Sequence, residues 1–87
     1  MLPGAEIIDK GLADLREQRE TVESLLVSIG ALRLREAGVG VPAKTFPSPE
    51  DRLYEMLRAE DPLTAHSRYN AFIRRLVSFE RAAECVK

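Results

Sequence analysis

The chain contains one cysteine and one histidine, the two residue types that would form a nucleophile and its base. Covalent catalysis needs the base within hydrogen-bond reach of the thiol. Cys85 and His66 fall in one segment expected to be helical, where 19 residues at 1.5 Å each would separate them by roughly 28 Å. They cannot pair within one chain, so we expect no catalytic role for Cys85.

Metal and nucleotide sites lack their sequence signatures. Zinc sites combine three or four Cys, His or carboxylate ligands at short spacing, and the chain has no CxxC, HxxxH or HExxH. His66 with Glu60 or Asp61 could hold one weakly bound ion, but a role in packing or solubility is favoured. Gly38 and Gly40 belong to no phosphate-binding motif and indicate a helix stop and a turn. We therefore predict no catalytic residue, no metal and no cofactor.

Arginine is the residue type that stands out near the end of the chain. The segment 64–87 carries five cations against two carboxylates, in a protein of net charge −1. Arginine makes forked contacts with carboxylate or phosphate groups. The candidate partner-binding residues are Arg68, Arg74, Arg75 and Arg81. They could meet an acidic protein partner or phosphate groups, or they could form a solvated face that balances acidic residues elsewhere in the chain.

These arginines belong to a segment, 62–86, whose pattern predicts an amphipathic helix. Six apolar residues share one face, which is the pattern of a helix packed on a core; they are Tyr69, Phe72, Ile73, Leu76, Phe79 and Ala83. At 100° per residue, Arg74 and Arg81 lie on the far side, while Arg68 and Arg75 flank the apolar stripe. Glu80 falls near the apolar edge, where a buried carboxylate would need an arginine as its partner.

The beginning of the chain carries a heptad pattern. Six apolar residues follow one another at alternating steps of four and three, with Arg19 in the one empty position; they are Ile8, Leu12, Leu15, Val22, Leu26 and Ile29. This spacing indicates one helical seam. It predicts a helix over about 4–37, roughly 50 Å long at 1.5 Å per residue.

Such a helix is longer than one small domain can cover, so we expect a homodimer. The candidate self-association residues are Leu15, Arg19, Val22 and Leu26, with Arg19 as the polar residue that fixes register. An intramolecular hairpin, in which the last helix covers the seam, is the alternative.

The segment Leu25–Leu34 is apolar almost all round the helix, which places the centre of the fold there. Gly30 within it indicates a close-packing point or a kink. Because short apolar runs are ambiguous, a buried strand over 24–34 is the competing interpretation.

The remaining boundaries carry local signals. Gly38 is placed to end the first helix, and Val39 could fold back on Leu34. After a loop over 38–47, Ser48 and Pro49 have the residue types of a helix start, which predicts a helix over 48–60. Asp61, before a proline, is expected to cap the helix over 62–86.

Composition completes the prediction. With 87 residues, 45% of them hydrophobic and 31% charged, the chain is long enough for one domain and too apolar for disorder. We find no secretory signal and no apolar run long enough to span a membrane, so we expect a cytoplasmic protein away from membranes.

The predicted fold is all-α: a long helical hairpin with a short third helix, in a single domain. The predicted function is non-catalytic, a small interaction or regulatory protein that presents helical surfaces to a protein partner. The alternative is a nucleic-acid-binding accessory protein that uses the arginine face of the last helix. Nucleic acid is the less favoured partner, because about three surplus charges can neutralise only a few phosphates.

Overall fold

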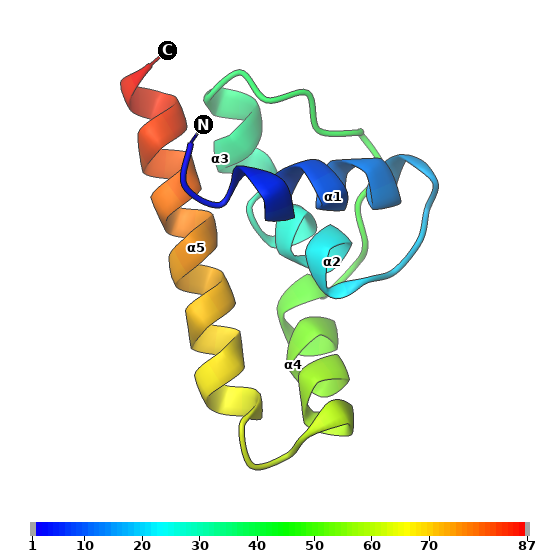
Figure 1. Cartoon of the computed structure of the whole chain (residues 1–87). Coiled ribbons are helices and arrows are strands. Elements are labelled where there is room, and N and C mark those ends of the chain that lie inside the picture. Colours follow the sequence, from blue (N-terminus) through cyan, green and yellow to red (C-terminus); the bar gives the residue numbers. More distant parts are fainter. Residues whose placement is uncertain (1, 87) are drawn as a thin grey trace.

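The computed structural model describes residues 2–86, and within that range every regular element is an α-helix (Figure 1). The helices are α1 (Ala5–Arg16), α2 (Val22–Ile29), α3 (Ala31–Glu36), α4 (Pro49–Glu60) and α5 (Ala65–Cys85). The all-α prediction is confirmed, and the alternative of a strand over 24–34 is wrong, because that segment lies in α2 and α3.

The predicted helix over 4–37 is three helices. A straight helix of that length would exceed the longest dimension of the molecule, which is 38 Å. The chain instead reverses after α1 through residues 17–21, where Gln18 takes a left-handed backbone with φ of 58°. Thr21 then begins α2 with a capping box, in which its hydroxyl accepts from the Ser24 N–H and the Ser24 hydroxyl accepts from the Thr21 N–H.

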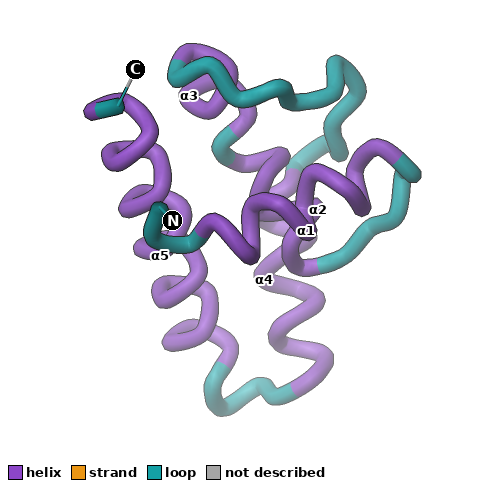
Figure 2. The backbone as a smooth tube through the Cα atoms, turned by 45° about the horizontal axis from the view of Figure 1, so that its top comes forward, coloured by secondary structure: helices purple, strands orange, loops and turns teal. Residues whose placement is uncertain are grey.

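The reversal lays α1 across α2 (Figure 2). The helices meet at Gly11, where a Cβ atom would lie 2.4 Å from the Glu23 carbonyl oxygen and 2.5 Å from Val27. Only a residue without a side chain allows this approach. A hydrogen bond also supports the turn, since the Thr21 hydroxyl donates to the buried Asp14 carboxylate at 2.8 Å.

Gly30 separates α2 from α3, so it marks a break rather than the interior of a helix. A Cβ at Gly30 would lie 2.7 Å from Glu80 and 2.8 Å from Leu76, so α5 approaches closely here. The end of α3 follows the sequence prediction. Gly38 is left-handed with φ of 91°, and the Val39 N–H donates to the Leu34 carbonyl at 2.9 Å.

Ser48 and Asp61 differ from their predicted roles. Ser48 stands before α4 but makes no capping hydrogen bond, and its backbone is left-handed with φ of 45°. Asp61 ends α4 instead of starting α5, and its carboxylate accepts the Leu63 N–H at 3.1 Å in the turn between the two helices. Thr64 is the residue before α5.

The hydrophobic core is centred on α2, which packs against α1, α4 and α5. Leu25, Leu26 and Val27 are fully buried, as is Leu34 in α3, so the predicted centre over Leu25–Leu34 is confirmed for these residues, whereas Leu32 is exposed. The other helices contribute further buried residues: Ile8, Leu12 and Leu15 from α1, Leu53 and Leu57 from α4, and Ala65, Leu76, Phe79 and Ala83 from α5.

The helices α4 and α5 form an antiparallel pair beside this core (Figure 1). Tyr54 and Tyr69 pack edge to face between them, with ring centroids 5.8 Å apart. At the far end of α5, Arg33 of α3 donates to Glu84 at 2.8 Å. Residues near both ends of α5 therefore contact neighbouring helices. These contacts lie on the core side of α5, and the opposite face is open to solvent.

Candidate interaction surface

The surface that faces solvent on α5 is the opposite side of the helix from its core stripe. Leu76, Phe79 and Ala83 are buried, whereas Arg74, Ser78 and Arg81 are exposed. This division follows from the helical period, because residues three, four and seven apart share a face. We call the solvent side, which comprises Ser67, Ala71, Arg74, Arg75, Ser78, Arg81 and Cys85, the outer face of α5.

Three of the four predicted partner-binding arginines lie on this outer face. Arg74, Arg75 and Arg81 are exposed, and none of them forms an ion pair with a described residue. Arg68 differs, because it pairs with Glu60 of α4 at 3.3 Å. The structure therefore brings three of the four together and assigns Arg68 to the contact between α4 and α5.

Most of the other arginines have partners within the chain. Arg19 pairs with Asp14 and Glu17, Arg33 with Glu80 and Glu84, and Arg52 with Glu20. The Arg35 guanidinium donates to the Pro42 carbonyl at 2.6 Å. Arg16 and Arg58 are exposed and, among the described residues, form no ion pair, but each stands at the end of its own helix. The outer face of α5 thus carries three such guanidinium groups within eight residues.

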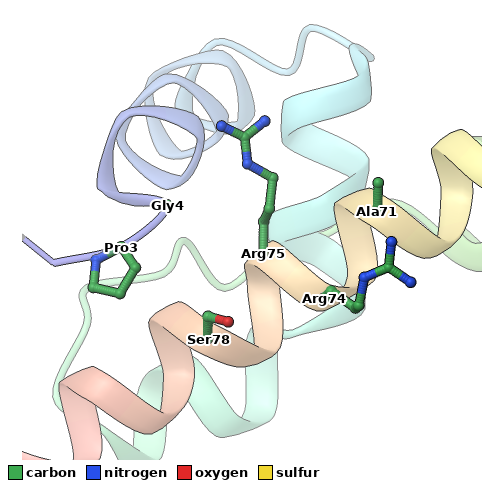
Figure 3. Close-up of a pocket in the computed structure, with 6 residues that line it drawn as sticks. All are labelled: Pro3, Gly4, Ala71, Arg74, Arg75 and Ser78. Carbon is green, nitrogen blue, oxygen red and sulfur yellow. The ribbon is translucent and has the colours of Figure 1, made fainter.

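A surface depression lies where the start of the chain meets this face (Figure 3). Its lining comes from the turn before α1 and from α5: Pro3, Gly4, Ala71, Arg74, Arg75 and Ser78. Gly4 is left-handed with φ of 79°, and a Cβ there would lie 3.0 Å from the Arg75 carbonyl oxygen. Glycine therefore lets the turn lie directly on α5. Figure 3 shows Arg74 and Arg75 pointing in different directions from neighbouring positions beside Ser78.

Sequence reasoning missed the contribution of Pro3 and Gly4 to this depression, since contacts between distant segments leave no local signal. Ala71 and Ser78 did leave one. They are seven residues apart, on the same side as Arg74 and Arg81, and their small size was the available indication of a recess.

The predicted self-association residues do not form an exposed surface. Leu15 and Leu26 are fully buried within this one chain, and Val22 is half-buried against the core. Arg19 is exposed and pairs with Asp14 at 3.3 Å. Within this chain α1 and α2 fold against each other and bury Leu15 and Leu26, while self-association itself stays a prediction.

His66 and Cys85, the residues considered for catalysis, lie near opposite ends of α5. His66 is near the start of α5, with its ring 3.3 Å from the Asn70 amide, and Cys85 is exposed at the end of the same helix. Glu60, considered as a ligand with His66, pairs with Arg68. Among residues 2–86 no group of three or more His, Cys, Asp or Glu is placed to hold a metal ion.

Glu80 is buried, as its place on the helix suggested, and its nearest cation is Arg33 at 3.7 Å. Burial raises the pKa of the Glu80 carboxyl above its ordinary value, while the Arg33 charge opposes that rise. The Glu80 side chain lies over Gly30, in the contact between α5 and the junction of α2 with α3. We assign it a structural role.

Comparison of the chain with protein-family models, curated proteins and solved structures found no significant match. No helix in the described part of the chain is long and apolar enough to cross a membrane.

Proposed function

We propose that this chain is a non-catalytic interaction protein that binds an acidic surface of a protein partner through the outer face of α5. The observation that carries the proposal is the set of three arginines, Arg74, Arg75 and Arg81, exposed together without an ion pair to any described residue. Arginine is among the residues most enriched at binding hot spots, where its planar group makes forked contacts with carboxylates.

The charge balance of the whole chain supports a short-range protein contact. The net charge is −1, so the molecule has no long-range attraction for polyanions. The positive charge on the outer face of α5 acts at contact distance, where a complementary acidic patch favours the correct partner and orientation. We place this interaction in the cytoplasm, because the single cysteine, Cys85, can form no internal disulfide.

Nucleic-acid binding is the second candidate, and the same arginines are the observation in its favour. Phosphate contacts depend on the number of cations that meet the backbone. Three arginines can neutralise only a few phosphates, so we rank this candidate below a protein partner. The homodimer predicted from the sequence stays a prediction, and it would need a surface other than the buried seam.

The proposal is tested by capture of partners from a lysate of the native host with the full chain as bait. The matched variants are Arg74→Glu/Arg81→Glu and the control Arg16→Glu/Arg58→Glu, which makes the same charge change away from the outer face of α5. Circular dichroism and thermal unfolding verify that both variants remain folded. We expect the control to retain the proteins captured by the wild type, and the α5 variant to lose them.

Loss of capture should be accompanied by weaker capture of the same proteins at high salt, because exposed charge pairs are screened. If both variants retained the same partners as the wild type, the outer face of α5 would not be the binding surface. If the α5 variant lost only nucleic acid, the second candidate would replace the first.

A further inference from the structure

The residues on the outer face of α5 have a regular spacing. Going along the helix, the steps alternate between four and three residues through six positions: Ser67, Ala71, Arg74, Ser78, Arg81 and Cys85. This is the spacing of a straight seam that another helix can follow. Five of the six residues are exposed and Ala71 is half-buried, so the seam is open along its length.

The side chains on this seam differ in size in a regular way. Two arginines, Arg74 and Arg81, stand one heptad apart, which is about 10 Å at 1.5 Å per residue. Between and before them stand Ser78 and Ala71, which also line the depression. Short side chains let a second backbone come close, while the arginines reach out along it. Arg75 borders the same depression from beside the seam.

The chain supplies no free carboxylate to this seam from α5 itself. The helix contains two glutamates, of which Glu80 is buried and Glu84 is engaged by Arg33 at 2.8 Å. Arg74 and Arg81 also form no ion pair with a described residue of any other element, so the carboxylates that would complement them are assigned to the occupant.

We propose that the occupant is an acidic α-helix of a partner protein, which lies along the outer face of α5. Its carboxylates one heptad apart meet Arg74 and Arg81, and a further acidic group meets Arg75 across the depression. An α-helix fits this face, because a helix repeats its side chains every seven residues and can place two carboxylates about 10 Å apart, in register with the two arginines. This inference rests on the proposed function and adds the form and charge spacing of the partner.

The experiment titrates the isotope-labelled full chain with two synthetic helical peptides, followed by NMR. Both peptides have the same alanine-based composition and net charge. One has glutamates at heptad spacing on a single face, and the other has them distributed around the helix. We expect shifts centred on Ala71, Arg74, Ser78 and Arg81, with the heptad peptide binding about tenfold more tightly, as two matched charge pairs would give.

Two sets of variants connect the effect to the seam. Arg74→Glu/Arg81→Glu should remove binding of the acidic peptide and create binding of a peptide with lysines at the same positions. Ser78→Leu, which fills the recess without changing charge, should weaken binding of the heptad peptide. Ala59→Leu, the matched change at an exposed position of α4, should have no effect.

The outcomes separate this inference from the proposed function. Equal affinity for both peptides, or no binding of either up to millimolar concentration, would overturn the helical occupant. If the lysate experiment still depended on Arg74 and Arg81, the proposed function would survive that result. Tighter binding of an RNA or DNA duplex than of the heptad peptide, removed by the same double change, would show that the seam serves nucleic acid and would overturn the inference.

Discussion

Two carboxylates are buried among the described residues, and their surroundings act on their charge in opposite directions. Hydrogen bonds from Lys10 and Thr21 hold the pKa of the Asp14 carboxyl below its ordinary value. Glu80 has Arg33 at 3.7 Å, beyond hydrogen-bond distance, and burial raises the pKa of its carboxyl. Charge on Asp14 therefore favours the folded state, while charge on Glu80 opposes it.

Replacement of Glu80 by glutamine tests this reading of the residue. A carboxyl whose pKa is raised by folding binds protons more tightly in the folded state, so its contribution to stability declines as pH rises through the raised pKa. Glutamine keeps the shape without the charge. We expect Glu80→Gln to match the wild type near pH 4 and to exceed its unfolding free energy by about 0.5–1 kcal/mol at pH 7.

Urea denaturation at several pH values between these limits measures the difference. The control is Glu84→Gln, which removes an exposed partner of the same Arg33. A Glu80→Gln variant that is less stable at pH 7 than at pH 4, relative to the wild type, would mean that pairing with Arg33 outweighs burial.

At the scale of single residues, the sequence predicted which side of the last helix each charged residue occupies. The helical period placed Glu80 at the apolar edge and Arg74 and Arg81 on the solvent side, because both follow from spacing within one helix. It could not show that Arg68 pairs with Glu60. That contact depends on how α4 turns back on α5, which is a property of the turn between them.

Among the elements, α4 and α5 were predicted because their signals are local. Pro49 stands at the first helical position and Pro62 interrupts the pattern between the two helices. The chain reversal at 17–21 escaped prediction, because the apolar pattern keeps the same phase on both sides of it. The signals that were present are Thr21 and Ser24, which form the capping box, and Gly11, which permits the close crossing.

Alanine at the two helix-contact glycines tests how these elements are held together. At Gly11 the added Cβ would meet the backbone of Glu23, which can move only with α2. At Gly30 it would meet the side-chain ends of Glu80 and Leu76, which can rotate. We expect Gly11→Ala to cost about 1–3 kcal/mol through overpacking, despite the better helix propensity of alanine.

Gly30→Ala should change the unfolding free energy by less than about 1 kcal/mol, because its propensity gain offsets a small rearrangement. Chemical denaturation of both variants gives the comparison, with Gly40→Ala as a control in open space. A larger loss for Gly30→Ala than for Gly11→Ala would contradict the close crossing of α1 and α2 as the tighter of the two contacts.

For the molecule as a whole, the seam predicted for self-association lies largely in the core, while the arginine face predicted for partner binding lies open on α5. Leu15 and Leu26 fill the core of one chain, so their apolar pattern indicates folding and not assembly. The positive charge gathers instead on the outer face of α5, in a chain of net charge −1. The proposed function depends on contact with this one face.

That charge distribution leads to a prediction about nucleic acid. Each phosphate neutralised contributes a slope of about −0.9 in log affinity against log salt. Arg74, Arg75 and Arg81 together would give a slope no steeper than about −3, and the net negative charge adds no long-range attraction. We expect no measurable duplex DNA or RNA binding at physiological salt and micromolar protein, as followed by fluorescence polarisation.

At low salt, any weak binding should disappear in Arg74→Glu/Arg81→Glu and persist in Arg16→Glu/Arg58→Glu. Sub-micromolar binding at physiological salt, lost in the first variant alone, would contradict the ranking of a protein partner above nucleic acid. Such affinity would require more phosphate contacts than these three arginines can make.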